Sequence, residues 1–250
     1  MRSYTSILSQ VSSLIQHQHT NIHKVGCSLN KNFIASYSYV SGGSIETEKR
    51  KVIDEMLRVD QAGEAAAVQI YAGQMWVLKD NKRAHEALNR MKEGEVKHLD
   101  TVERLMSTRR SRPSLLLPVW RAAGFALGAA TALLGKDAAM ACTVAVETVI
   151  SEHYNSQIRE MLKRGLTTES ELSSTATTKA TMHGETVTPL EDKSSSDAAL
   201  LRMMSKHRDE ELEHHADALK MGAENAPFYN TLTGGIKAGC AAAIVVAKRV

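Results

Sequence analysis

Residues 88–105, LNRMKEGEVKHLDTVERL, decide the fold because they combine a helical apolar pattern with two residues that such a pattern normally excludes. Steps of three and four residues define the inward-facing stripe of an amphipathic helix. Here that stripe consists of Leu88, Met91, Glu95, His98, Val102 and Leu105. The segment therefore predicts a helix of about residues 83–106 that turns a carboxylate and an imidazole toward the protein core.

Three other segments, about residues 47–79, 136–163 and 198–221, repeat this pattern. Their stripes carry Asp60, Glu64 and Tyr71 in the first, Glu147, Ser151 and Tyr154 in the second, and His207, Glu211 and His214 in the third. A buried carboxylate costs several kcal/mol unless it is paired or bound to metal. The one Glu of each stripe and the two histidines that lie three residues after Glu95 and Glu211 would repel one another in an empty core, so they predict two divalent cations.

The spacing of these residues matches a known kind of metal site. In di-iron and di-manganese carboxylate bundles, two helices each supply one Glu, and two others each supply Glu-x-x-His. Residues three apart on a helix can reach one cation together. We therefore predict an all-α fold, a ferritin-like four-helix bundle, in which Glu147 bridges two metals. The predicted ligands are Glu64, Glu95, His98, Glu147, Glu211 and His214.

The specificity of this prediction comes from its repetition, because a single Glu-x-x-His is more often a solvated helix face. Glu95 follows Glu64 by 31 residues, and Glu211 follows Glu147 by 64, or by 33 without the segment 167–197. Two similar helical hairpins would each supply half of the site. His215, four residues after Glu211, also faces inward, but the three-residue spacing of Glu95 and His98 favours His214 as the ligand.

Four residues near the ligand turns have two open interpretations. Asp60, Asp209, His153 and Tyr154 could orient metal-bound imidazoles or move electrons. They could equally be surface acids and a packed aromatic side chain.

Composition narrows the function classes. Apolar residues make up 43% of the 250 residues and aromatic residues 4%, which favours helices packed through aliphatic side chains. A net charge of +3 without a basic stripe gives no support to nucleic-acid binding. Cys27, Cys142 and Cys240 form no C-x-x-C pair, which indicates a reducing compartment and no thiolate metal site.

The domain organisation is one helical domain, 46–250, behind a leader. Residues 1–45 contain no Asp or Glu and are rich in Ser, as in a mitochondrial transit peptide, although a disordered tail is the alternative. Residues 167–197 are rich in Ser and Thr without apolar periodicity, so we expect a disordered surface insertion.

Two apolar segments, 115–134 and 235–250, lie outside the metal stripes. The first is long enough to span a membrane, but Pro118 and Arg121 argue against burial in lipid. Trp120 beside Arg121 favours a helix lying at the membrane interface, and an ordinary crossover segment is the alternative. We expect additional membrane-associating helices rather than a true span.

Six motifs lie along the helical part of the chain: RVDQAGE (58–64), IYAGQM (70–75), EVKHL (95–99), ACTVAVE (141–147), HYNSQ (153–157) and RDEELEHH (208–215). Together they resemble the demethoxyubiquinone hydroxylases of ubiquinone biosynthesis, and the resemblance covers roughly residues 50–250. The resemblance implies the same six ligands for two iron ions, and a His-Tyr pair at His153 and Tyr154. This family usually has a second Glu after the third ligand, where this chain has Thr148, and the 167–197 insertion is also unusual.

The resemblance also implies the reaction and its setting: hydroxylation of a polyprenyl benzoquinone by O₂, with NADH as the reductant. It implies peripheral attachment to the matrix side of the mitochondrial inner membrane, and a lipid-binding partner protein of the pathway. A homo-oligomer is compatible with the sequence. No G-x-G-x-x-G motif is present, so the nicotinamide would bind outside a Rossmann domain.

Three other functions compete with this one. A ferritin-like iron-binding or peroxide-detoxifying protein is the first, but its hydrophilic shell fits poorly with the apolar segments 115–134 and 235–250. The second, a ribonucleotide-reductase-like radical protein, is normally longer. A metal-free helical scaffold is the third, and metal analysis separates it from the others.

Overall fold

The computed structural model describes residues 31–166 and 197–250, with side chains from residue 46 onward. Two compact units divide the chain, Met1–Arg50 and Lys51–Val250, and the bundle lies in the second. The elements are α2 (Lys31–Val77), α3 (Lys82–Arg109), α4 (Leu117–Leu133), α5 (Lys136–Lys163), α7 (Asp197–Lys220), the 3-10 turn η2 (Ala223–Asn225) and α8 (Tyr229–Ala247). The described residues contain no strand, which confirms the all-α class.

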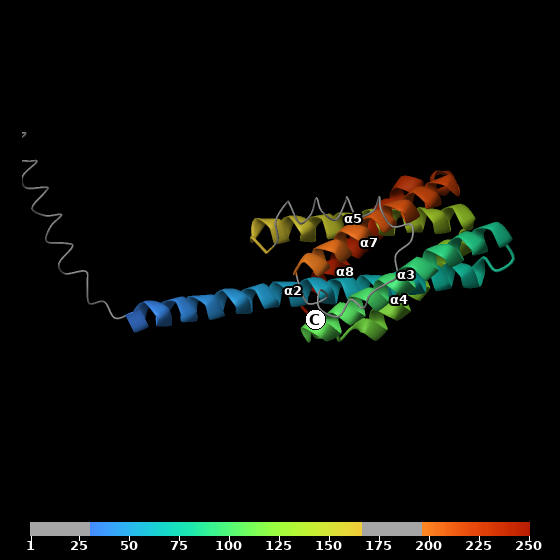
Figure 1. The fold of residues 1–250 in the computed structure, drawn as a ribbon. Coiled ribbons are helices and arrows are strands. Elements are labelled where there is room, and N and C mark those ends of the chain that lie inside the picture. The colour runs from blue at the N-terminus through green and yellow to red at the C-terminus, as the bar shows by residue number, and fades with distance from the viewer. Residues whose placement is uncertain (1–30, 167–196) are drawn as a thin grey trace, which may run out of the picture. The chain divides into compact units, whose positions relative to one another are not determined.

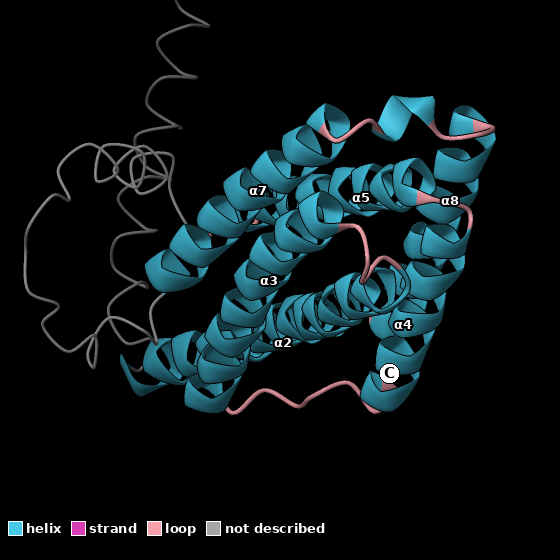
Figure 2. Ribbon diagram, turned by 90° about the vertical axis from the view of Figure 1, so that its right-hand side faces the viewer, coloured by secondary structure: helices cyan, strands magenta, loops and turns pink. Residues whose placement is uncertain are grey.

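Four long helices, α2, α3, α5 and α7, lie side by side and form the bundle (Figures 1 and 2). One apolar layer includes Leu57, Val102, Ile158 and Leu200, one from each helix in that order. A second layer includes Tyr71, Leu88, Met140 and Ala218. Along every helix the predicted ligands fall between these two positions, so apolar layers close the candidate site at both ends. In α2 and α7 the residue of the first layer precedes that of the second along the chain, whereas in α3 and α5 it follows, so α2 and α7 run opposite to α3 and α5.

Capping groups define both ends of α3. Asn81 caps the start of the helix, where its side chain accepts a hydrogen bond from the backbone N–H of Ala84 at 3.1 Å. Arg110 ends it in the left-handed conformation, with φ of 55°. Pro118 then lies in the first turn of α4, where a missing N–H does no harm.

Glycines allow α4 to approach α2 closely. A Cβ on Gly128 would lie 2.0 Å from the carbonyl oxygen of Ile70, and one on Gly124 would lie 2.4 Å from that of Ala66. From the other side, a Cβ on Gly73 would lie 2.3 Å from the carbonyl oxygen of Phe125. Any larger residue at these three positions would push the helices apart.

The two additional helices, α4 and α8, expose apolar side chains. Leu133 and Leu134 at the end of α4 are 72% and 62% exposed, and Val245 on α8 is 52% exposed. In the described part of the chain, α8 is long and apolar enough to cross a membrane by length and composition, but one such helix is weak evidence. Two apolar helices beside the bundle agree with the predicted fold, and their association with a membrane stays a prediction.

Two expectations concern residues that lie largely outside those described. The leader, 1–45, is described only as the backbone of α2 from Lys31, so the transit peptide stays a prediction. Residues 167–196 of the predicted insertion lie outside the described residues. Its last residue, Asp197, is the first residue of α7 and forms an ion pair with Arg109 of α3 at 3.3 Å, and the disorder of the insertion stays a prediction.

Candidate metal centre

The six predicted ligands converge at mid-height of the bundle in two overlapping groups. Within each group the candidate ligand atoms lie within 4.8 Å of one another. One group is Glu64, Glu95, His98 and Glu211, and the other is Glu95, Glu147, Glu211 and His214. All are buried except His214, whose side chain is 14% exposed. The structure therefore brings together every residue of the predicted set, and their binding of metal stays a prediction.

The shared members of the two groups are Glu95 and Glu211, which come from the two Glu-x-x-His helices. Nδ1 of His98 lies 3.0 Å from Oε1 of Glu211, and Nδ1 of His214 lies 2.8 Å from Oε1 of Glu95. Each histidine thus approaches the carboxylate of the other hairpin. We expected Glu147 to bridge the two metals. In the structure Glu147 belongs to one group only, and Glu95 and Glu211 are the members common to both groups.

The donor atoms of this cluster fit divalent metal ions. Buried atoms without a hydrogen-bond partner include both carboxylate oxygens of Glu95 and Glu211, Oε2 of Glu64 and Glu147, and Nδ1 of His98 and His214. A folded protein rarely leaves so many polar atoms unsatisfied in one place. Carboxylate oxygens with imidazole nitrogens suit iron or manganese in a helical bundle.

The electrostatics of the cluster also fit the binding of cations. Burial raises the pKa of Glu64 and of Glu147 well above the ordinary range, and neighbouring carboxylates raise both further. Burial also acts to raise the pKa of Glu95, but the two neighbouring histidines, His98 and His214, outweigh it and lower that pKa to about 2. Burial would lower the pKa of His98 and His214, yet the surrounding carboxylates raise both, that of His214 to about 10. The site thus favours positive charge.

Two tyrosines each donate a hydrogen bond to a predicted ligand on another helix, the carboxylate of Glu147 or of Glu64, each of which belongs to only one of these two groups of four. Tyr71 of α2 donates a hydrogen bond to Oε1 of Glu147 on α5 at 2.6 Å. Tyr154 of α5 donates one to Oε1 of Glu64 on α2. Tyr154 therefore contacts a predicted ligand, which favours a role in positioning that ligand over simple packing. Tyr71 lies in the predicted inward stripe, but the sequence pattern assigns it no role.

The two predicted imidazole ligands have different outer neighbours. Nε2 of His98 lies 2.8 Å from Oε2 of Glu210, a carboxylate that can orient the ring. The ring of His214 instead lies over Gly94, where an added Cβ would come within 3.0 Å of its Nε2. Sequence reasoning missed Glu210 and considered Asp209, which pairs with neighbouring Arg208 at 2.8 Å.

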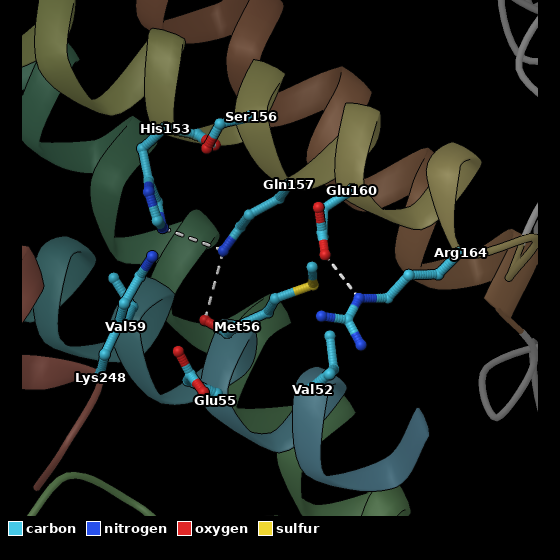
Figure 3. A pocket seen from close by; sticks show the side chains of 10 residues that line it. All are labelled: Val52, Glu55, Met56, Val59, His153, Ser156, Gln157, Glu160, Arg164 and Lys248. Carbon is cyan, nitrogen blue, oxygen red and sulfur yellow. Dashed lines mark hydrogen bonds and ion pairs between the residues drawn. The ribbon is translucent and has the colours of Figure 1, made fainter. Parts of the chain in front are cut away.

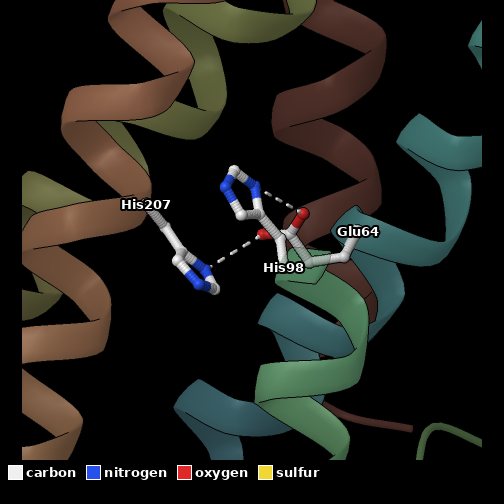
Figure 4. Close-up of side chains that lie close together, drawn as sticks. All are labelled: Glu64, His98 and His207. Atoms are coloured by element: carbon white, nitrogen blue, oxygen red, sulfur yellow. Dashed lines mark ion pairs between the residues drawn. The ribbon is translucent and has the colours of Figure 1, made fainter. Parts of the chain in front are cut away.

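His207 is a further imidazole at the site to which sequence reasoning assigned no role. It lies in the inward stripe of α7 and forms a third group with Glu64 and His98, all three buried (Figure 4). Its ring stacks on that of His98 with centroids 4.1 Å apart. Burial and the nearby charge of His98 lower the pKa of His207 to about 3.

A pocket of about 330 Å³ opens between α2, α5 and the end of α8 (Figure 3). His153 lines it, and its Nε2 lies 3.0 Å from Nε2 of Gln157. Gln157 also donates a hydrogen bond to Oδ1 of buried Asp60 at 2.7 Å. Burial raises the pKa of Asp60 to about 8, against the effect of this bond. His153 therefore faces this pocket, its Nε2 lies 3.7 Å from Oδ1 of Asp60, and neither residue belongs to the metal-type groups of the described residues.

An apolar pocket of about 100 Å³ lies on another side of the centre, between α2, α4, α5 and α8. Its lining includes Gly63 and Val146, the residues directly before the ligands Glu64 and Glu147. Trp120 from α4 also lines it. This pocket therefore brings apolar surface next to two of the predicted metal ligands.

Thr148 lies directly after the predicted ligand Glu147 and is half-buried. Its hydroxyl donates a hydrogen bond at 2.6 Å to the carbonyl oxygen of Val144, one turn earlier in α5. The Thr148 hydroxyl is therefore satisfied within its own helix.

Similar proteins are found among curated sequences. The human NADPH-dependent 3-demethoxyubiquinone 3-hydroxylase, mitochondrial, is 41% identical over 209 residues, which cover 84% of this chain and 83% of that protein. The 3-demethoxyubiquinol 3-hydroxylase of Rhodospirillum rubrum is 42% identical over 199 residues, covering 80% and 79%. The 5-demethoxyubiquinone hydroxylase, mitochondrial, of Saccharomyces cerevisiae is 42% identical over 199 residues, covering 79% and 78%.

The match to a family model agrees with these relatives. The model of the ubiquinone biosynthesis protein COQ7 matches residues 51–247, the whole bundle with both apolar helices and all six predicted ligands. The resemblance read from the motifs at residues 58–64 and 208–215 is thereby confirmed. This chain belongs to the COQ7 family of ubiquinone biosynthesis proteins.

Proposed function

We propose that this chain is a di-iron monooxygenase that hydroxylates the ring of 5-demethoxyubiquinone, a polyprenyl benzoquinone, in ubiquinone biosynthesis. The observation that carries the proposal is the cluster of carboxylate and imidazole atoms without hydrogen-bond partners, enclosed by two apolar layers. Relatives 41–42% identical that are named demethoxyubiquinone or demethoxyubiquinol hydroxylases give the substrate class.

The ligands would divide between two iron ions as the two groups do. Glu64 and His98 would hold one ion, Glu147 and His214 the other, and Glu95 with Glu211 would serve both. When bound, the irons supply the oxygen activation and electron transfer that side chains cannot perform. One atom of O₂ would be inserted into a ring C–H bond as a hydroxyl group, and the other would leave as water with two electrons and one proton from the nicotinamide and one proton from solvent.

The protein's own residues would position the ligands and exclude water. Tyr71 and Tyr154 hold the carboxylates of Glu147 and Glu64 in fixed orientations through their hydroxyl groups. The apolar layers above and below exclude water from the centre. The apolar pocket beside Gly63 is the place where we expect the quinone ring to approach, because it adjoins the predicted ligands and is lined by aliphatic side chains.

A polyprenyl tail is too apolar to cross water, so the substrate must come from a membrane. We propose peripheral attachment through the exposed apolar side chains of α4 and α8, on the matrix side of the mitochondrial inner membrane. Two of the relatives are named mitochondrial, which supports the compartment. Exposed Arg121, Lys248 and Arg249 would each add about 1 kcal/mol near anionic headgroups. A lipid-binding partner protein of the pathway would help to deliver the quinone.

The reductant would be a nicotinamide nucleotide, NADH in our proposal. The human relative is named NADPH-dependent, which supports the nicotinamide class but leaves the choice of nucleotide to experiment. Comparing NADH with NADPH at equal concentrations in the assay decides between them.

The test is a single-turnover assay of the purified chain loaded with ferrous iron under anaerobic conditions. With NADH and a demethoxyquinone present, a pulse of O₂ should yield one hydroxylated quinone for each reduced site. Glu211→Ala is the matched control and should form no product. Peroxide consumption without quinone hydroxylation would instead support the ferritin-like peroxide-detoxifying alternative.

Membrane access has its own test. Trp120 lines the apolar pocket and donates a hydrogen bond to the hydroxyl of Ser114, so the changes belong at the exposed residues of the α4 region. The variant replaces Leu115, Val119, Leu133 and Leu134 with Ser. We expect weaker binding to anionic liposomes and slower turnover of a long-tailed quinone, with iron content and turnover of a short-tailed quinone retained. Unchanged liposome binding would refute the access model. Val96→Ser with Leu212→Ser, on exposed bundle faces, is the control for liposome binding.

A further inference from the structure

His207 stands at the metal centre without a part in the six-ligand set. Its Nδ1 lies 3.9 Å from Oε1 of Glu64, and Nδ1 of His98 lies 3.6 Å from Oε2 of the same carboxylate. Figure 4 shows the two imidazoles on neighbouring helices, each turned toward one oxygen of Glu64. One carboxylate therefore faces two ring nitrogens.

These separations are those of ligand atoms around a single ion. Imidazole nitrogens and carboxylate oxygens lie about 2 Å from a divalent first-row metal, so two ligand atoms on one ion are roughly 3–4 Å apart. The candidate atoms of Glu64, His98 and His207 all lie within 4.8 Å of one another. A small inward shift would let all three contact one cation.

The competing role for His207 is a hydrogen bond with Tyr154. Nδ1 of His207 lies 3.3 Å from the Tyr154 hydroxyl, which is long for such a bond, and that hydroxyl already donates to Glu64. Nδ1 is also the atom that His98 and His214 turn toward the shared carboxylates. Nδ1 of His207 differs from Nδ1 of His98 and His214 in having this one hydrogen-bond partner, but like them it faces a carboxylate of the cluster.

We propose that His207 is a seventh metal-binding residue, which gives the ion held by Glu64 and His98 a second nitrogen ligand. The proposal rests on the proposed di-iron function and adds an asymmetry to it. One ion would have two nitrogen ligands, and the other, beside Glu147, would have one. The equivalent position on α3, four residues before Glu95 as His207 is four before Glu211, is Met91, which offers no nitrogen.

The experiment counts nitrogen ligands directly. Protein labelled with ¹⁵N-histidine is loaded with Fe²⁺, partly oxidised to the mixed-valent state, and examined by pulsed EPR. Anaerobic Fe²⁺ titration gives the affinity of each ion. His207→Phe removes the nitrogen while filling the space of the ring, and Tyr154→Phe removes only the hydroxyl. If His207→Phe does not fold, as judged by circular dichroism, His207→Gln is measured in its place.

The parent should show three histidine nitrogens coupled to iron. His207→Phe should show two and should bind one of its two ions roughly tenfold or more weakly, while Tyr154→Phe keeps all three couplings. Unchanged couplings and affinities in His207→Phe would overturn the proposal. Equal changes in His207→Phe and Tyr154→Phe would also overturn it, because His207 would then act only through the tyrosine. A parent that binds no iron would contradict the proposed function itself.

Discussion

The two halves of the bundle, α2 with α3 and α5 with α7, share a frame around their ligands. Seven residues after Glu64 comes Tyr71, and seven after Glu147 comes Tyr154. Each tyrosine donates a hydrogen bond to the terminal carboxylate of the other half. The halves thus hold each other's ligands, and neither can complete its own site alone.

The difference between the halves lies in the neighbours of the histidines. Four residues before the Glu of each Glu-x-x-His, α7 has His207 where α3 has Met91. One residue before it, α7 has Glu210 where α3 has Gly94. The imidazole of His98 is therefore surrounded by polar groups, while that of His214 lies over a bare glycine backbone.

This contrast teaches that the repeated residues build the shared centre and the unrepeated ones make its two sides different. The carboxylates repeat because a two-metal site in a helical bundle takes one Glu from each of two helices and Glu-x-x-His from the other two. The unrepeated polar residues, His207 and Glu210, both lie beside His98, so two bound ions would have unequal surroundings.

The largest expected effect comes from breaking the shared centre rather than one half. Glu211→Ala removes a carboxylate that both ligand groups use, so we expect loss of both irons and of turnover. Glu147→Ala removes a ligand of one group only, so about one iron per chain should remain, held by the Glu64 and His98 half. Iron per chain, measured after gel filtration, checks both. Loss of both irons from Glu147→Ala would restore Glu147 as a bridging ligand.

The next effect tests the ligand assignment on α7. His214→Ala should lose the ion beside Glu147, since Nδ1 of His214 contacts the shared carboxylates of Glu95 and Glu211 at 2.8 and 3.3 Å. His215→Ala should keep both ions, because its half-buried ring belongs to none of the metal-type groups in the described chain. Iron analysis of the two variants under one protocol decides. The reverse result would make His215 the ligand.

Much of this centre could be predicted from the sequence because helical periodicity alone places residues on a face. Glu64, Glu95, Glu147 and Glu211 occupied apolar stripes, and a stripe shows which side chains point inward without any knowledge of the contacts between helices. The assignment of the bundle as all-α followed from the same stripes.

The contacts between helices could not be read in this way. Whether Glu147 or Glu211 lies between the metals depends on the rotation of one helix against another. The pairing of Glu210 with His98 joins residues 112 positions apart, and nothing within α7 distinguishes it from the neighbouring Asp209. His207 was in the inward stripe, but its proximity to Glu64 depends on how α7 packs against α2.

A moderate effect should follow from changing the residue that contacts each predicted histidine ligand on the side away from the metals, Glu210 for His98 and Gly94 for His214. Glu210→Gln keeps the size of the side chain but removes the charge that orients His98, so iron affinity should fall by about 10–100-fold. Gly94→Ala should weaken the other half, because the new methyl group would crowd Nε2 of His214. Anaerobic Fe²⁺ titration measures both. If Glu210→Gln binds iron as the parent does, the polar surroundings of His98 do not influence the metal.

The smallest effect compares the crossing tyrosines in protein stripped of metal. Tyr71→Phe leaves Oε1 of buried Glu147 without its donor and should lower the free energy of unfolding by about 1–3 kcal/mol. Tyr154→Phe should cost at least as much, because its hydroxyl contacts both Glu64 and His207. Urea unfolding of the two variants beside the parent measures the difference. A costlier Tyr71→Phe would show that the contact between Tyr154 and His207 contributes nothing to the metal-free fold, and that the halves differ only once metal binds.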